Sequence, residues 1–404
     1  RERDNYYGEL EVILSFLAFN SITGMSEHHR RAYKLLSGAP QTLSKQGIWT
    51  FGAPSVLGLY LRTGCSLRQT VEDMQECMPP YYLLSGWHGA GAAELTEAEA
   101  LLLQGRVDEM DMPLQKAYYQ AEKHGQECIT ICCDFLEMQR DLFRGVYSSK
   151  AEAYSRQQWQ LQPWKQSVLL NTADMCAGFY YALLGKPEYI PSWLTDGNGQ
   201  QPSVLYPARP CRNYISAQCL LAQGQYTELL VRWSDWEQEC RPYSNFLCLL
   251  YLQVQRAAAF AGRGDVTSCR ASLKQALAMA AADKLVLPLA QNIALLRPYL
   301  EQEAHGEYSA AAAVALQLGQ QLEAGRGQIL SARFAEAGLQ ELTEQELQIA
   351  QLAAARHTNR EIAQRLALSE GTIKQYLNKI FAKLQIDATA KNKRHQLERF
   401  FPNS

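Results

Sequence analysis

Glycines recur at nearly constant spacing through the middle of the chain, and this rhythm constrains the fold more than any other feature. The intervals are 40, 40, 39, 38 and 44 residues, and the positions are Gly105, Gly145, Gly185, Gly224, Gly262 and Gly306. Between them, apolar residues recur three and four positions apart, the period of one helix face. Glycine readily adopts the left-handed conformation that ends a helix. Each period is therefore predicted to be one helical hairpin.

Stacking of these hairpins follows from their size. A single hairpin cannot bury its apolar face, so its neighbours must cover it, as in tetratricopeptide repeats (TPR) and related solenoids. Strand signals are sparse up to residue 322, and a chain of 404 residues is too long for one core. We therefore expect an all-α protein in which residues 1–322 form a TPR-like superhelix. The rhythm is weaker before Gly105, and residues 196–210 are expected to form a long connection.

Composition indicates a cytoplasmic protein that does not enter the membrane. No apolar run approaches the ~20 residues that span a bilayer. The first residues, RERDNYYGEL, lack the order of a signal peptide. The 11 cysteines form no CxxC pair, so we expect reduced thiols and no disulfides. Because the sequence starts at Arg1 and not at Met, we expect a fragment of a longer protein.

Two groups in the repeat region contain residue types that bind ligands. His124, Cys128 and Cys132 can share one helix face, as metal ligands would, but packed thiols are the favoured interpretation because no fourth ligand is evident. Aromatic residues can line a pocket for a small ligand, although packing between hairpins explains them more simply. These residues are Tyr81, Tyr82, Trp87, Tyr118, Tyr119, Tyr180 and Tyr181. No nucleotide-binding loop or catalytic constellation is found, so we expect no metal, no cofactor and no enzymatic activity.

The rhythm ends before residues 323–340, which are expected to link the repeat to a separate domain, residues 341–404. There Thr343 and Glu346 have capping-box spacing, which predicts the start of a helix. Two further short helices are predicted at 359–366 and 370–384, with Ser369 as the cap of the second. Helices joined this tightly form a helix-turn-helix, whose second helix can enter the major groove of DNA.

The helix predicted at 370–384 has two unlike faces. Its apolar residues at 373, 377, 380, 381 and 384 point inward, and the small Ala363 lets the preceding helix approach closely. The polar face consists of Thr372, Lys374, Gln375, Asn378, Lys379 and Lys383. Amide and lysine side chains pair with base edges, while outlying lysines neutralise phosphates. Residues 341–404 hold 10 Lys and Arg against 7 Asp and Glu, an excess that an ordinary solvated surface explains equally well.

The segment LTEQELQIAQLAAARHTNREIAQRLALSEGTIKQYLNKIFAKLQI resembles the LuxR-type DNA-binding domain. The family pattern includes Leu-Thr, Asn-(Lys/Arg)-Glu-Ile-Ala, Ser, Thr-(Val/Ile)-Lys and Lys-Leu, nearly all of which are present in register. The preceding hairpins are similar to the sensor repeats of the MalT-like branch of this family. Members of that branch usually carry an upstream NTPase module that uses ATP, which agrees with a fragment beginning at Arg1.

The resemblance implies a four-helix domain that binds double-stranded DNA as a dimer, with its third helix in the major groove. By position, the residues expected to contact bases are Lys374, Gln375 and Asn378. Those expected to contact the DNA backbone are Thr358, Thr372, Lys379 and Lys383. Glu346 and Glu361 are expected to fix helices. A fourth helix, at 389–401, is expected to supply the dimer face.

Three places depart from the family pattern. Arg356 replaces the glycine that ends the first helix, so we expect His357 to adopt the left-handed turn instead. Tyr376 replaces a histidine, which would alter one phosphate contact. The sequence DATAKNKRHQLERF lacks the common arginine-bearing start of the last helix.

These features together predict a sequence-specific transcriptional regulator whose helical repeat senses a small ligand or a protein partner. The alternative is a helical-repeat scaffold for a protein partner, with C-terminal helices that serve only in dimerisation.

Overall fold

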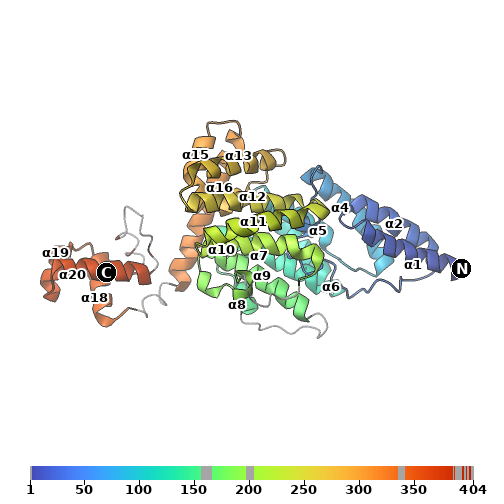
Figure 1. Cartoon of the computed structure of the whole chain (residues 1–404). Helices are drawn as coiled ribbons and strands as arrows, with labels where there is room; N and C mark the ends of the chain where they lie inside the picture. Colours follow the sequence, from blue (N-terminus) through green and yellow to red (C-terminus); the bar gives the residue numbers. More distant parts are fainter. Residues whose placement is uncertain are drawn as a thin grey trace. The chain divides into compact units, whose positions relative to one another are not determined.

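The protein is all-α, as its periodicity predicts (Figure 1). The computed structural model describes residues 2–155, 166–196, 204–334 and 342–384, together with residues 386, 394, 397, 400 and 401. These residues form no β-strand, and their one isolated β-bridge joins Arg62 to Asn245. None of their helices is long and apolar enough to cross a membrane.

The chain divides into two compact units. The first comprises Arg1–Arg144 and Ser148–Glu323, and the second comprises residues 145–147 and Ala324–Ser404. The helices up to residue 184 are α1 Glu2–Leu17, α2 Ile22–Leu35, α3 Val56–Tyr60, α4 Leu67–Ser85, α5 Ala92–Leu103, α6 Asp111–His124, α7 Glu127–Arg144, α8 Ser149–Ser155 and α9 Gln166–Leu184. Those that follow are α10 Arg209–Ala222, α11 Tyr226–Cys240, α12 Phe246–Gly262, α13 Val266–Ala281, α14 Leu287–Gln291, α15 Ile293–Glu303 and α16 Ser309–Ile329. The C-terminal helices are α18 Glu344–Ala354, α19 Asn359–Leu366 and α20 Glu370–Lys383.

The expected linker at 323–340 begins as regular helix. Helix α16 continues to Ile329, and a π-helical turn at Leu330–Phe334 follows it directly. Residues 335–340 lie outside the described part of the chain.

Left-handed glycines end most of the helices that the glycine rhythm predicts. Gly105, Gly145, Gly185 and Gly224 all have φ between 68° and 78°. The prediction was wrong for Gly262, because the left-handed residue is Gly264, 40 positions after Gly224. Gly262 is helical and packs against the ring of Tyr226, which a Cβ at this position would approach to 2.5 Å.

Gly306, the last glycine of the predicted rhythm, does not have a positive φ either. The 40-residue spacing of left-handed helix ends therefore stops after Gly264.

The core of the first unit lies between neighbouring helices, with α10, α11 and α12 side by side (Figure 1). Helix α12 is buried on nearly all sides, including Leu250, Leu252 and Val254. The rings of Tyr214 and Tyr251 stack there with centroids 4.5 Å apart. Large aromatic side chains such as these supply much of the apolar area that a core buries.

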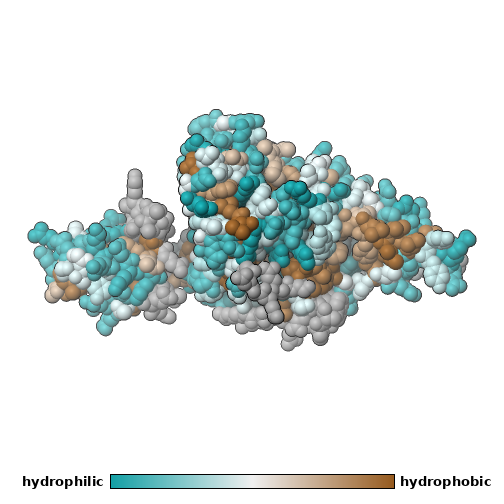
Figure 2. Space-filling model, in the orientation of Figure 1, coloured by the Kyte–Doolittle hydropathy of each residue, from teal (hydrophilic) through white to brown (hydrophobic). Residues whose placement is uncertain are grey.

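Helix α1 buries its small residues and exposes its large ones. Val12 is buried, whereas Leu10, Ile13 and Leu17 are 46%, 47% and 82% exposed. Gly8 is buried because Leu36 lies against it, at 2.6 Å from where a Cβ would be. Figure 2 shows a hydrophobic region, in brown, over α1 and α2.

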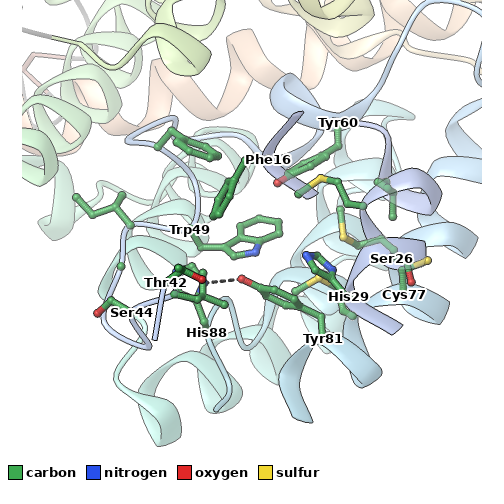
Figure 3. A pocket seen from close by; sticks show the side chains of 18 residues that line it. Phe16, Ser26, His29, Thr42, Ser44, Trp49, Tyr60, Cys77, Tyr81 and His88 are labelled. Atoms are coloured by element: carbon green, nitrogen blue, oxygen red, sulfur yellow. Dashed lines mark hydrogen bonds between the residues drawn. The ribbon is translucent and has the colours of Figure 1, made fainter. Parts of the chain in front are cut away.

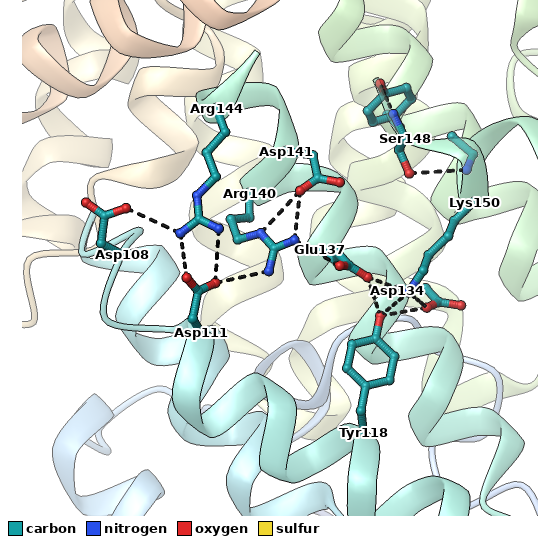
Figure 4. Close-up of polar contacts among 12 residues, drawn as sticks. Asp108, Asp111, Tyr118, Asp134, Glu137, Arg140, Asp141, Arg144, Ser148 and Lys150 are labelled. Carbon is teal, nitrogen blue, oxygen red and sulfur yellow. Dashed lines mark hydrogen bonds and ion pairs between the residues drawn. The ribbon is translucent and has the colours of Figure 1, made fainter. Parts of the chain in front are cut away.

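Charged side chains join α6, α7 and α8 (Figure 4). Arg140 and Arg144 of α7 donate to Asp111 at the start of α6, at 3.0 and 2.6 Å. Lys150 of α8 donates to Asp134 of α7 at 2.5 Å. Asp134 is only 8% exposed, so its partners compensate a desolvation cost that an exposed pair would not have.

Candidate nucleic-acid interface

Helices α18, α19 and α20 pack around a small apolar core in the second unit. The fully buried residues include Ile349, Ile362, Ile373 and Ile380, and Phe381 packs against them at the edge. Ala363 is 5% exposed at the contact between α19 and α20. The inward face predicted for α20 and the close approach predicted at Ala363 are therefore confirmed.

Side-chain caps begin all three helices. At α18 the Glu346 amide donates to the Thr343 hydroxyl at 3.3 Å, and the Thr343 amide donates to the Glu346 carboxylate at 2.9 Å. This confirms the predicted capping box. Ser369 caps α20 as predicted, accepting from the Thr372 amide at 3.1 Å. Each such cap stabilises a helix by about 1 kcal/mol.

A second capping box begins α19, although its spacing was not recognised in the sequence. The Thr358 amide donates to the Glu361 carboxylate at 2.7 Å, and the Glu361 amide donates to the Thr358 hydroxyl at 3.3 Å. These contacts confirm that Glu361, like Glu346, fixes a helix. The Thr-x-x-Glu spacing at 358–361 was the signal that could have revealed it.

Two left-handed residues shape the connections. Ala367 has φ 54° at the end of α19, and the Leu368 amide closes the turn by donating to the Ala363 carbonyl at 2.9 Å. Arg356 has φ 64° after α18, so the expectation that His357 would take this conformation was wrong. The helix-ending bonds explain why: the amides of Arg356 and His357 donate to the carbonyls of Ala353 and Leu352, which places Arg356 at the left-handed position.

The polar face of α20 presents a compact set of side chains to solvent. Lys374, Gln375 and Asn378 are all exposed. At 3.6 residues per turn, they lie within an arc of about 100°. Ile373, Leu377 and Ile380 anchor the opposite face and hold this arc outward. The arc therefore combines a cation with two amide groups, the chemistry that reads base edges.

Of the four residues expected to contact the DNA backbone, three already form side-chain hydrogen bonds within the protein. The Thr358 hydroxyl donates to Glu361 at 2.9 Å, and the Thr372 hydroxyl lies 2.7 Å from that of Ser369. Lys383 donates to the buried Glu346 at 2.6 Å. Lys379 is exposed and forms no ion pair with any described residue.

Tyr376, at the position of the family histidine, contacts the protein itself. Its hydroxyl donates to the side-chain oxygen of Gln345 on α18 at 2.9 Å. This bond holds α20 against α18, so the substitution adds a contact between these helices.

The helix expected at 389–401 falls mostly outside the described residues. Leu397 is fully buried in the core of the second unit, and Phe400 and Phe401 pack against it. The Arg394 guanidinium donates to the His357 carbonyl and to the side chain of Asn359.

The ligand candidates of the first unit do not assemble into one site. Within the described residues, no group of three or more His, Cys, Asp or Glu is placed to hold a metal ion. His124 stacks on Trp87 at 4.2 Å, and Cys128 and Cys132 are buried. Burial raises the pKa of the Cys132 thiol well above its usual value. All 11 cysteines are free thiols in this structure.

The seven candidate aromatic residues have different environments. Tyr180 and Tyr181 are fully buried, and Tyr119 is 61% exposed. Tyr82 and Trp87 stack on each other at 5.4 Å. Tyr81 alone among the seven lines the cavity near the N-terminus that is described below.

The helical geometry of residues 342–384 is that of a helix-turn-helix domain, and comparison with known families agrees. Residues 340–392 match the family described as bacterial regulatory proteins, luxR family. This segment is a luxR-family helix-turn-helix domain, the DNA-binding part of a transcription regulator. No curated protein matches the chain in a sequence comparison.

Proposed function

We propose that the protein regulates transcription by binding specific double-stranded DNA sequences as a dimer, with α20 in the major groove. The observation that carries this proposal is the exposed arc of Lys374, Gln375 and Asn378 on a helix anchored from behind by its apolar face. Lysine pairs with guanine and the amides pair with adenine. Thr358, Thr372, Lys379 and Lys383 are assigned to the DNA backbone, where contacts position the helix without reading sequence.

The test compares two exposed lysines of α20. Duplexes bound by the full chain are selected from a random pool, and affinities are then measured by fluorescence anisotropy over a range of salt. Lys374→Ala is expected to lose discrimination at one or two base pairs, by about 1–3 kcal/mol each. Lys379→Ala is expected to weaken all sequences alike and to reduce the salt slope by about 0.9. Equal effects of the two changes on every sequence would contradict these roles, and failure to select any sequence would contradict the proposal.

We further propose that the first unit is a TPR-like sensor domain, residues 1–322, that responds to a small inducer or a protein partner in the cytoplasm. Its recurring helix ends, spaced about 40 residues apart, support repeated hairpins. Residues 323–340 would then connect sensor and DNA-binding domain. A ligand that binds the folded first unit must raise its stability, which a thermal-shift screen of the full chain detects.

A second candidate function is a scaffold that holds a protein partner, with C-terminal helices that only dimerise. The exposed apolar residues of α1, including Leu10, Ile13 and Leu17, favour it because such surfaces commonly bind other proteins. DNA affinity that does not depend on sequence, together with a stable protein complex, would support this alternative over the regulator.

A further inference from the structure

The first unit contains a cavity of about 250 Å³ near its N-terminal end (Figure 3). Helices α1 and α2 form one wall, α3 and α4 form another, and residues 42–51 close a third side. The lining includes Met25, Met74 and Met78, whose flexible thioethers adapt to aromatic rings. Sequence periodicity did not indicate this cavity, because its walls come from segments that are separate in the chain.

Among the polar groups in the cavity wall that form no hydrogen bond with another described residue are the Trp49 indole N–H, the Tyr60 hydroxyl and the His29 imidazole. Figure 3 shows all three directed into the cavity. These side chains are only 8%, 4% and 9% exposed. Buried polar groups are normally hydrogen-bonded, so these three can bond to a molecule that occupies the cavity.

A neighbouring pair shows how such groups are satisfied within the protein. The Tyr81 hydroxyl and His88 Nδ1 lie 2.7 Å apart in the same wall. That bond satisfies the Tyr81 hydroxyl, whereas no such bond to a described residue is formed by the Trp49 N–H or the Tyr60 hydroxyl. His29 adds a neutral ring, since burial, with a smaller contribution from His28, lowers the pKa of His29 to about 4.

The cavity carries no formal charge. None of its lining residues is Lys, Arg, Asp or Glu. An ionised ligand would lose its hydration without gaining a counter-charge, which is strongly unfavourable. Its volume lies between an engineered cavity of about 150 Å³ that binds benzene and drug-sized pockets, which start near 300 Å³.

We propose that this cavity binds an uncharged aromatic molecule, between one substituted ring and two fused rings in size, that carries a hydrogen-bond acceptor. Trp49 and Tyr60 donate to the acceptor, His29 contributes a further polar contact, and the methionines enclose the ring. The inference deepens the proposed sensing role of the first unit and rests on it. A bound ligand would bridge the α1–α2 hairpin to α4 and so change the stability of the hairpin.

The test uses fluorine NMR on the full chain, with 6-fluoroquinoline as the probe. This bicyclic molecule is uncharged near neutral pH and has one ring nitrogen that accepts a hydrogen bond. Its matched control is 6-fluoro-N-methylquinolinium, which has similar size but a permanent charge and no acceptor. Saturable line broadening by the first probe, with at least tenfold weaker binding of the second, is the expected result.

Variants then assign the site. Trp49→Phe and Tyr60→Phe each remove one donor and keep a ring, so each should weaken 6-fluoroquinoline binding by about three- to tenfold. Tyr119→Phe, at a residue that is 61% exposed, is the matched control and should have no effect. If Trp49→Phe does not fold, Tyr60→Phe decides the question, because it deletes a single oxygen.

The proposal is overturned if 6-fluoroquinoline shows no saturable binding, if the quinolinium binds as tightly, or if folded Tyr60→Phe binds like the unaltered chain. The titration contains no DNA. A negative result therefore removes the cavity proposal alone, whereas failure to select a DNA sequence removes the proposed regulator and leaves this result standing.

Discussion

Lys383→Met tests whether an ion pair between α18 and α20 holds the helix-turn-helix together. The Lys383 ammonium lies 2.6 Å from a Glu346 carboxylate oxygen, and the Glu346 side chain is only 6% exposed. The same carboxylate accepts the capping-box bond of Thr343 at 2.9 Å. Methionine keeps most of the aliphatic chain of lysine and removes its charge. The buried Glu346 carboxylate then keeps, among the described residues, only its hydrogen bond from the Thr343 amide.

The expected cost lies between two known limits. Exposed pairs contribute up to about 1 kcal/mol, and loss of one partner from a fully buried pair costs about 3–5 kcal/mol. Because the Lys383 side chain is 35% exposed, solvent screens part of the interaction, and we expect a loss of about 1–2 kcal/mol.

Hydrogen exchange read by mass spectrometry is the appropriate assay, because every tryptophan of the chain lies between residues 49 and 236 and none reports on the second unit. Amides of α18 and α20 in Lys383→Met should exchange about 5- to 30-fold faster at neutral pH. The control is Lys379→Met, an exposed lysine on the same helix, which should change exchange less than about twofold. Equal exchange in the Lys383 variant and the unaltered chain would refute the reasoning.

The ion pair also predicts a pH dependence. Hydrogen bonds from Lys383 and from the Thr343 amide lower the pKa of Glu346 from 4.5. This stabilisation is therefore complete above pH 4.5 and is lost as the pH falls through the folded-state pKa. The difference in exchange between Lys383→Met and the unaltered chain should narrow in that acidic range.

The same variant tests the predicted DNA contact of Lys383. Loss of a phosphate contact would reduce the salt slope of binding by about 0.9. Loss of the ion pair alone would leave the slope unchanged.

Three further substitutions have defined outcomes. Arg356→Gly relieves a φ of 64° and should slow exchange in α18 by an amount that corresponds to about 1 kcal/mol; faster exchange would contradict the assigned cap. Gly178→Ala places a Cβ 2.3 Å from a Leu194 methyl and should lower the free energy of unfolding by about 1–3 kcal/mol, measured by urea unfolding followed by tryptophan fluorescence. The control is Gly125→Ser, where no described atom beyond the neighbouring residues lies within 4 Å of an added Cβ, so this steric cost is absent and only the left-handed backbone is strained. Burial raises the pKa of Glu99 to about 7, so the fold favours its protonated form. The free energy of unfolding should therefore fall as the pH rises from 4.5 to 7, by up to about 1.4 kcal/mol per pH unit. Glu99→Gln should remove that dependence, and an unchanged pH dependence in the variant would contradict the assignment.

Local patterns predicted the helix-turn-helix closely. Helix α19 occupies the predicted residues 359–366, and α20 begins at Glu370 after its predicted Ser369 cap. Helix caps and apolar periodicity involve residues only a few positions apart, so the spacing of residues in the sequence is enough to predict them. The left-handed position after α18 was assigned one residue late, because it depends on where the last helical hydrogen bonds close.

Contacts between distant residues could not be predicted in this way. Lys383 and Glu346 are 37 residues apart, and the same lysine looks like a free phosphate contact in the sequence. In α1, Gly8 is buried because the close approach of Leu36 requires a small residue, whereas Leu10 is exposed.

The sequence by itself determined that this chain is helical, where its C-terminal helices begin, and which face of α20 is polar, since short-range hydrogen bonds and helical periodicity set those features. The tertiary structure decided which of the polar groups remain available to a ligand. Packing joined Lys383 to Glu346 and left Lys379 exposed, and it brought Trp49, Tyr60 and His29 around one cavity. Such arrangements depend on how separate helices meet, which no spacing along the chain specifies.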